Sequence, residues 1–147
     1  MKIVIGSDHA GYHLKLELAG HLRRAGHDVD DVGSHDPGAV DFPDIARAVC
    51  GAVRAGGGAR GLLVCGTGVG ASIAANKVRG IRAAVCHDVH SAHQSVEHDD
   101  VNVMCIGAQI VGPWLARDLV DAFLAAEFER SEDYLRRVQK LHDMEAG

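Results

Sequence analysis

The 147-residue sequence has few aromatic residues, no long apolar run and no excess of positive charge. Phe, Trp and Tyr together make up 4% of the chain. No apolar stretch approaches the roughly 20 residues that a membrane-spanning helix requires, so neither a membrane span nor a membrane partner is expected. Fifteen basic residues against twenty acidic ones give a formal net charge of −5, which argues against a nucleic-acid partner.

The N-terminus and the cysteines indicate a cellular compartment. The chain begins Met-Lys-Ile-Val-Ile-Gly, which has the pattern of a first strand and not of a secretory signal. Four cysteines in a chain without such a signal are expected to be reduced thiols: Cys50, Cys65, Cys86 and Cys105. The sequence therefore predicts a cytoplasmic protein.

Strand patterns alternate with helical patterns along the whole chain, and 18 glycines allow tight connections between them. The expected strands are Lys2–Gly6, Val29–Val32, Leu62–Cys65, Ile81–Cys86 and Val101–Gly107. The expected helices are Tyr12–Ala25, Ile45–Ala55, Ala71–Val78, Val89–Glu97, Pro113–Phe128 and Glu132–Glu145. This alternation predicts an α/β protein of one domain over residues 1–147. We expect a Rossmann-like three-layer sandwich with a five-stranded parallel sheet, helices on both faces and an extra C-terminal helix.

Residues 61–72 contain the feature with the most chemical content. A short apolar run ends at Cys65, the next five residues hold three glycines around Thr67 and Val69, and a helical segment follows. The backbone N–H groups of such a glycine-rich turn can bind an anion or an oxyanion. A cysteine that faces a helix N-terminus has its thiolate stabilised by the aligned peptide dipoles. Cys65 is therefore a candidate base or nucleophile, whereas Cys50 and Cys105 lie in apolar runs and are expected to be core thiols.

The glycine turn has a second interpretation. Its spacing Gly66-x-Gly68-x-x-Ala71, with Asp88 further along, also fits the dinucleotide-binding fingerprint. Against this interpretation, the turn follows the third expected strand and not the first. No second domain is expected that would hold a hydride acceptor.

Histidines are concentrated in one segment, at His87, His90, His93 and His98. On a helix the first three would cover one broad face, so they could form either a metal site or a solvated polar face. No cysteine or carboxylate pattern with the usual zinc spacing completes the set. We therefore expect no metal.

Further candidate residues follow the carboxyl ends of the strands, where ligands bind in an open α/β sheet. The first strand ends at Ser7-Asp8-His9. Asp8 either caps the following helix or, with His9, orients substrate hydroxyls. His98 directly precedes the fifth strand, and we expect it close to the same crevice.

Six motifs occur in order along nearly the whole chain. They are Ser-Asp-His-Ala-Gly at 7–11, Val-Asp-Phe-Pro-Asp-Ile-Ala at 40–46, Cys-Gly-Thr-Gly-Val-Gly at 65–70, Ala-Ala-Asn-Lys at 74–77, Gly-Ile-Arg-Ala at 80–83 and Glu-His-Asp-Asp-Val-Asn-Val at 97–103. In this register they resemble the B-type ribose-5-phosphate isomerases, a family that also includes the galactose-6-phosphate isomerase subunits. The resemblance extends from Lys2 to about Arg137.

The resemblance implies an aldose–ketose isomerase that works through an enediolate, without a metal or organic cofactor. It implies ribose 5-phosphate and ribulose 5-phosphate as substrates and a homodimer whose active site is shared across the interface. In this scheme Cys65 moves a proton between C1 and C2 and Thr67 assists transfer between the two oxygens. His98 opens the furanose ring as acid and base.

The resemblance also implies which residues bind the substrate. Asp8 and His9 would contact the sugar hydroxyls, and Arg137 with Arg136 would bind the phosphate. The enediolate oxygen would be bound by backbone N–H groups of the turn, at Gly66, Gly68, Val69 and Gly70. Asp99 and Gln109 occupy two further positions beside the site.

Three positions depart from the family's pattern. Asp99 stands where an asparagine usually follows the histidine, Gln109 stands where an arginine is common, and Asp133 lies in a segment that replaces Gly-Gly-Arg-His. Neither glutamine nor aspartate supplies the bidentate fork with which arginine binds phosphate. The alternative substrates are therefore another sugar phosphate or an unphosphorylated sugar or uronate. The alternative that is not an enzyme is a nucleotide- or sugar-binding module.

Overall fold

The computed structural model describes residues 1–146, so that Gly147, the last residue of the expected domain, lies outside the described residues. The strands are β1 (Lys2–Ser7), β2 (Asp28–Asp31), β3 (Arg60–Cys65), β4 (Ala83–Val85) and β5 (Val103–Gly107). The helices are α1 (Tyr12–Arg24), α2 (Phe42–Ala55), α3 (Val69–Ala75), α4 (Val89–Asp99), α5 (Pro113–Ala125) and α6 (Glu132–Glu145). None of these helices has the length and hydrophobicity needed to cross a membrane.

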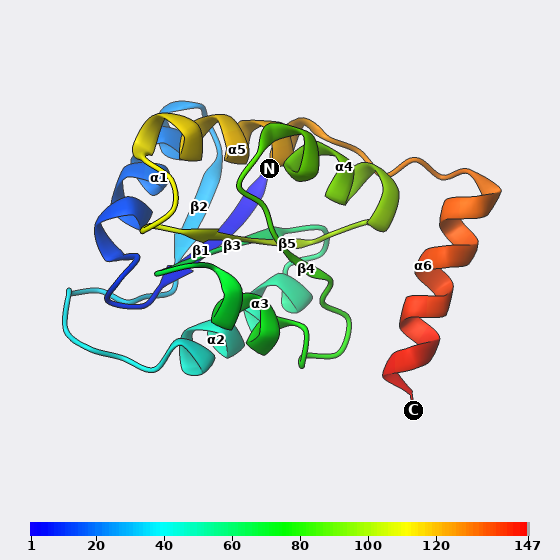
Figure 1. The fold of residues 1–147 in the computed structure, drawn as a ribbon, viewed down its shortest axis with the longest axis horizontal. Coiled ribbons are helices and arrows are strands. Elements are labelled where there is room, and N and C mark those ends of the chain that lie inside the picture. Colours follow the sequence, from blue (N-terminus) through cyan, green and yellow to red (C-terminus); the bar gives the residue numbers. More distant parts are fainter. Residues whose placement is uncertain (147) are drawn as a thin grey trace.

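The five strands form one parallel sheet in the order β2-β1-β3-β5-β4. Helices α1, α4 and α5 cover one face of the sheet, and α2 and α3 cover the other (Figure 1). This arrangement follows from right-handed crossovers, because the chain reverses its direction across the sheet after β2 and again after β4. The α/β class, the parallel sheet and the helices on both faces are confirmed.

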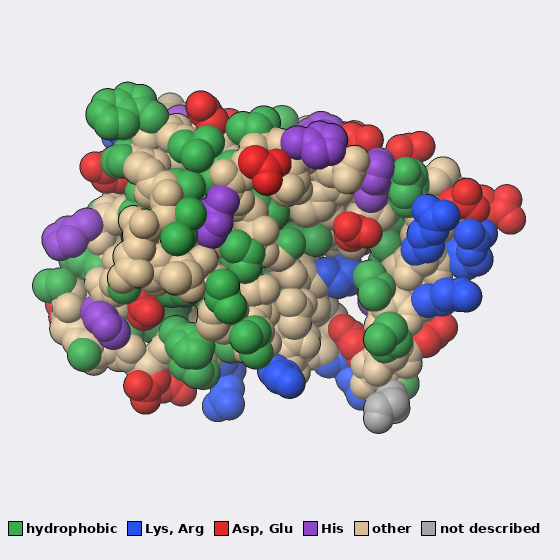
Figure 2. Space-filling view, in the orientation of Figure 1, with side chains coloured by type: hydrophobic (Ala, Val, Ile, Leu, Met, Phe, Trp, Pro, Cys, Tyr) green, Lys and Arg blue, Asp and Glu red, His purple; other side chains and the backbone are tan. Residues whose placement is uncertain are grey.

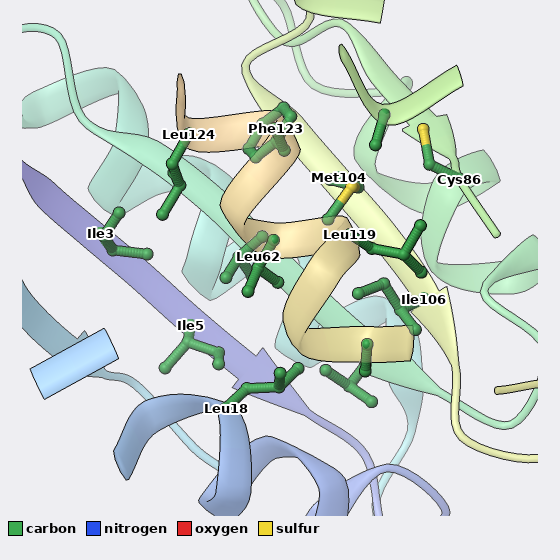
Figure 3. Close-up of a cluster of buried hydrophobic side chains, with 14 of the residues drawn as sticks. Ile3, Ile5, Leu18, Leu62, Cys86, Met104, Ile106, Leu119, Phe123 and Leu124 are labelled. Carbon is green, nitrogen blue, oxygen red and sulfur yellow. The ribbon is translucent and has the colours of Figure 1, made fainter. Parts of the chain in front are cut away.

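Two apolar cores lie on the two faces of the sheet. On β3, Leu62 and Val64 point into the core beneath α1, α4 and α5, while Leu63 and Cys65 point into the core beneath α2 and α3. Figure 3 shows the first core, where Phe123 and Leu119 of α5 lie over the sheet. Because side chains alternate between the two faces, the last residue of β3 directs its thiol towards α2 and α3.

Several elements end at other residues than the sequence pattern predicts. Helix α5 ends at Ala125 and not at Phe128, because the Arg60 guanidinium donates to the carbonyl oxygens of Phe123, Leu124 and Ala126 at 2.6, 3.3 and 2.8 Å. Helix α3 begins two residues earlier than expected, at Val69, and strand β4 is limited to Ala83–Val85. The other ends differ from the expected ones by three residues or fewer, which is within the usual uncertainty of a boundary inferred from sequence.

Helix α6 stands beside the rest of the molecule, beyond the β4 edge of the sheet (Figure 1). Val138 is its only buried residue. Near its start the Tyr134 hydroxyl lies 3.1 Å from Nε2 of His98, and near its end the Glu145 carboxylate accepts the Gly80 N–H at 3.0 Å. Three apolar side chains of α6 are exposed to 42–75%: Leu135, Leu141 and Met144. The extra C-terminal helix is thus confirmed, with an apolar face that its own chain does not cover.

Lys15 is fully buried and joins α1 to the end of β2. Its Nζ donates to Oδ1 of Asp31 at 3.0 Å and to the carbonyl oxygen of Ser34. We expect Lys15→Ala to lower the free energy of unfolding by about 3 kcal/mol, because it leaves the Asp31 carboxylate without its cationic partner. Urea unfolding measures the change. The control, Lys140→Ala on the exposed face of α6, should change stability by less than about 0.5 kcal/mol. An equally small change for Lys15→Ala would contradict the expectation.

Candidate active site

Cys65 ends β3 at the entrance of the glycine turn. Its side chain is buried, and Sγ accepts the backbone N–H of Gly68 at 3.0 Å. Gly68 has a φ of +80°, and a Cβ built there would lie 3.2 Å from the carbonyl carbon of Ile106. Only glycine combines this conformation with this close approach. The turn therefore fixes a peptide donor at the sulfur atom.

The other three thiols are in different surroundings. Burial raises the pKa of Cys50 to about 11, and it raises the pKa of Cys86 and, more strongly, that of Cys105. Cys50 and Cys105 are fully buried in the core beneath α2 and α3, as predicted. A thiol with a raised pKa is protonated at neutral pH and a poor base, so these three thiols are not candidate bases.

The residues after Cys65 form a tight junction of three chain segments. The Thr67 side chain is exposed, and its Oγ1 accepts the N–H of Val69 at 3.3 Å. A Cβ built at Gly70 would lie 2.5 Å from the Phe42 ring of α2, and one built at Gly107 would lie 2.6 Å from Cα of Thr67. Peptide N–H groups in the first turn of a helix have no acceptor within the helix. The Val69 N–H is taken up by Thr67 Oγ1, so the N–H groups of Gly70 and Ala71 are the first-turn donors that a ligand at this junction could use.

Asp8 and His9 line an open pocket of about 430 Å³ at the same edge of the sheet. The loop before α2 and its first turn, residues 40–44, form the other wall. Oδ1 of Asp8 accepts the Gly11 N–H at 3.1 Å, but Gly11 is the N-cap residue of α1 and no side chain caps this helix, so the capping alternative for Asp8 is wrong. Nδ1 of His9 accepts the Val40 N–H at 3.3 Å. The His9 ring therefore has its other nitrogen, Nε2, for a ligand.

Gln109 lies on the far side of the glycine turn. Its backbone N–H donates to the Gly66 carbonyl at 3.0 Å, and a Cβ built at Gly66 would be 3.3 Å from its amide group. The preceding residue, Ala108, donates to the Cys65 carbonyl at 2.8 Å. The ends of β1, β3 and β5 thus bring Cys65, Thr67, Asp8, His9 and Gln109 to one edge of the sheet, as expected.

The expectation that His98 lies near this crevice is wrong within a single chain. Helix α4 starts after the carboxyl end of β4 and returns the chain over 11 residues to the start of β5. At about 1.5 Å per residue, it carries His98 about 16 Å back along the strand direction. Cys65 ends the neighbouring strand β3, whereas His98 lies near the first residue of β5. The Cys65 and His98 side chains therefore lie at opposite ends of the strands, Cys65 at the carboxyl ends and His98 at the amino ends.

The predicted phosphate-binding residues lie on the His98 side. Arg136 Nη1 pairs with Oδ1 of Asp133 at 2.9 Å, and both side chains are exposed. The Arg137 guanidinium lies over the Tyr134 ring, 5.7 Å from its centroid, and no ion pair of Arg137 occurs within residues 1–146. Lys and Arg side chains gather on this side of the molecule, along α6 (Figure 2). Asp99 is also here, in an open pocket with Leu141 and Met144.

The dinucleotide interpretation does not fit the sheet order. Asp88 follows β4, which is separated from β3 by β5. Its carboxylate instead caps α4 by accepting the Ser91 N–H at 2.6 Å, and this hydrogen bond lowers the pKa of Asp88. The ribose-binding acid of the fingerprint would have to lie on the strand next to the turn.

The histidines at 87, 90, 93 and 98 do not form one helix face, since His87 lies before α4. His87 precedes α4, and its Nε2 accepts the Gly107 N–H at 2.8 Å. His98 stacks on Tyr134 with ring centroids 4.4 Å apart. Through this hydrogen bond His87 holds the end of β5 in place. The spacing of the histidines in the sequence does not predict this role.

The sequence reasoning did not single out two residues that contact the candidate site residues. Phe42 packs against Gly70, and Tyr134 lies against His98. The motif at residues 40–46 contains Phe42 and could have indicated it. Tyr134 lies within a segment that departs from the family's pattern, so no motif marks it.

The sequence matches the family described as Ribose/Galactose Isomerase over residues 3–141. The chain belongs to this family. It is 47% identical over 128 residues to a ribose-5-phosphate isomerase B of Escherichia coli strain K12, covering 87% of this chain and 86% of that protein. It is 42% identical over 131 residues to a D-erythrulose-4-phosphate isomerase of Pectobacterium atrosepticum, covering 88% of this chain and 86% of the relative. The solved structure of a Clostridium thermocellum ribose-5-phosphate isomerase B superposes with a TM-score of 0.96 at 49% identity, covering 99% and 98% of the two chains.

Gly68 offers a test of the turn in this ribose/galactose isomerase family member. We expect Gly68→Ala to lower the free energy of unfolding by about 1–3 kcal/mol, because φ is +80° and an alanine is strained there. The displaced N–H should also lower kcat by at least about 10-fold. Unfolding and steady-state kinetics measure the two effects. The control is Gly51→Ala in α2, where a Cβ meets no atom within 4 Å and alanine should raise stability slightly. Full activity of Gly68→Ala would show that the donor is dispensable.

Proposed function

We propose that this protein is an aldose–ketose isomerase that interconverts ribose 5-phosphate and ribulose 5-phosphate. The observation that carries the proposal is the buried Cys65 thiol with a peptide donor at its sulfur atom, beside the pocket lined by Asp8 and His9. Membership in a family of sugar isomerases supports it. A cytoplasmic location and catalysis without a cofactor remain predictions from the sequence.

The chemistry of the reaction explains the arrangement. Removing a proton from the carbon beside a carbonyl needs a positioned base and fixed donors for the oxygen that becomes negative. Cys65 as a thiolate would take the proton from C2 of the aldose and return it to C1. The N–H groups of the glycine turn would bind the enediolate oxygen, while Thr67 assists proton transfer between O1 and O2. Asp8 and His9 would orient the sugar hydroxyls.

A second copy of the chain supplies the remaining groups in this proposal. Ring opening needs an acid and base at the ring oxygen, and His98 lies at the opposite edge of the sheet from Cys65 in its own chain. The uncovered apolar side chains Leu135, Leu141 and Met144 of α6 fit an interface between two copies. In a homodimer with two-fold symmetry each copy would give His98, Arg136 and Arg137 to its partner's site.

A tetrose phosphate is the second candidate substrate. A relative that is 42% identical is a D-erythrulose-4-phosphate isomerase, so this level of similarity includes enzymes for different chain lengths. Gln109 lies beside the glycine turn at the position where an arginine is common. An unphosphorylated sugar or uronate would require that Arg137 binds no phosphate.

Arg137 provides the test between these substrates. We expect Arg137→Ala to lower kcat/KM for ribose 5-phosphate by about 10–100-fold, because hydrogen bonds to a charged group contribute about 1.5–3 kcal/mol. Turnover of unphosphorylated ribose and allose should not change. The control is Arg24→Ala, an exposed arginine of α1. Steady-state kinetics on ribose 5-phosphate, D-erythrulose 4-phosphate, ribose and allose decides the substrate. Turnover of ribose or allose alone would overturn a phosphate substrate.

A further inference from the structure

Two chain segments bring carboxylates and an imidazole together beside α6. Glu97 and His98 are at the end of α4, and Glu129 lies in the segment between α5 and α6. One ligand atom from each of the three residues lies within 4.8 Å of the others. The Glu129 N–H donates to the Glu97 carbonyl at 2.9 Å, which fixes the two segments to each other.

A fourth side chain extends this cluster. His93 precedes Glu97 by one helical turn, and its Nε2 lies 2.5 Å from Oε2 of Glu97. His93 thus contacts the other oxygen of Glu97 than His98 does, and the extended cluster has two imidazoles and two carboxylates: His93, Glu97, His98 and Glu129. The histidine spacing alone did not indicate it, because Glu129 comes from a segment 31 positions after His98 and is brought there by the fold.

The composition of the cluster fits a zinc ion, and Glu97, His98 and Glu129 already lie close enough together to share one. Zn²⁺ takes four ligands in a tetrahedron, with imidazole nitrogen and carboxylate oxygen about 2.0–2.2 Å away, so neighbouring ligand atoms lie about 3.4 Å apart. His98 Nε2 and Glu97 Oε1 have about this spacing at 3.5 Å, whereas His93 Nε2 and Oε2 of Glu97, at 2.5 Å, would move apart for both to bind the ion. Two carboxylates and two neutral imidazoles carry a charge of −2, which balances a divalent cation. The partly exposed side chains leave the ion a path from solvent.

We propose that His93, Glu97, His98 and Glu129 bind Zn²⁺ and that the ion inhibits the enzyme reversibly. The inhibition rests on the proposed function, in which His98 opens the sugar ring. An ion on Nε2 of His98 occupies the lone pair that would accept a proton, and it displaces the Tyr134 hydroxyl now 3.1 Å away. The metal-free protein is therefore the active form, and Zn²⁺ is not a cofactor of the reaction.

Metal binding is tested without reference to activity. Zn²⁺ is titrated calorimetrically into the full chain after chelator treatment, and Co²⁺ is added separately to record the visible absorption of a four-coordinate ion. We expect one tight site per chain, and at least about 10-fold weaker binding in both His93→Ala and Glu129→Gln. The matched control is His90→Ala, an exposed histidine on the same helix outside the cluster, which should bind as the unchanged protein does. Equal affinity in all four proteins would overturn the site.

The inhibition is tested on the same variants. His93 and Glu129 lie outside the catalytic and substrate-binding residues, so both variants should keep the metal-free turnover. They should require at least about 10-fold more Zn²⁺ for half inhibition. Tight binding to the cluster with unchanged turnover would overturn the inhibition. A metal-free protein without isomerase activity would instead contradict the proposed function, and the calorimetric result on the site would stand.

Discussion

Replacing Cys65 by alanine is expected to lower kcat for the isomerisation by about 10²–10⁴-fold, the range that a positioned general base contributes. The sulfur atom lies at the entrance of the glycine turn, and its peptide donor from Gly68 is 3.0 Å away. The fold should survive the change, because the thiol is small and the strand is held by β1 and β5 on its two sides.

The matched control for this variant is Cys50→Ala. Cys50 is also buried in the core beneath α2 and α3, so both variants remove one buried sulfur atom. We expect a similar loss of stability in the two proteins and a loss of turnover in Cys65→Ala alone. Steady-state kinetics and urea unfolding of both give the comparison. If Cys65→Ala kept more than about a tenth of the turnover, the thiol would not be the base.

Mixing two inactive variants is expected to restore activity. A dimer of Cys65→Ala with His98→Ala would contain one site with both lesions and one site with both residues intact. Random exchange of subunits makes half of the dimers mixed, so roughly a quarter of the unchanged activity should return. The measurement is turnover after the two variants are unfolded and refolded together, compared with each variant refolded alone.

A control mixture distinguishes recovery through a shared site from recovery by any other cause. Cys65 and Thr67 lie on the same edge of the sheet, so a mixture of Cys65→Ala with Thr67→Ala places one lesion in every site. No activity beyond that of the separate variants should return. Recovery in neither mixture would contradict a site shared between two copies, and light scattering of the unchanged protein would then be expected to show a monomer.

The elements of the fold could be predicted because β1, β3 and β5 are short apolar runs that end at or next to a glycine, and helical patterns lie between the strands. The order of the strands within the sheet could not be predicted. Strand β4 follows β3 in the chain, but β5 lies between them in the sheet. Local residue patterns carry no information on whether a crossover skips one position. The ends of β4 and α5 were missed for a related reason, since the Arg60 contact that ends α5 is between residues 63–66 positions apart.

The candidate site could be predicted in part. Cys65, Thr67, Asp8 and His9 follow strand ends, and the carboxyl ends of parallel strands meet at one edge whatever the strand order. His98 was placed beside them because it directly precedes β5. A residue before a parallel strand lies at the amino ends of the strands, away from the carboxyl ends where Cys65 is found. The neighbours Tyr134 and Glu129 come from beyond α5 and are brought to His98 by tertiary packing.

The loose attachment of α6 has a consequence for how this protein changes over evolution. Since Val138 is the only residue that α6 buries, most of its positions can accept substitutions at little cost in stability. At the start of α6, Ser-Glu-Asp-Tyr at 131–134 stands where the family resemblance leads one to expect Gly-Gly-Arg-His. In the proposed function the reaction chemistry is fixed in the sheet and substrate recognition lies on this tolerant helix, so a lineage could alter its choice of substrate while the reaction chemistry is inherited intact.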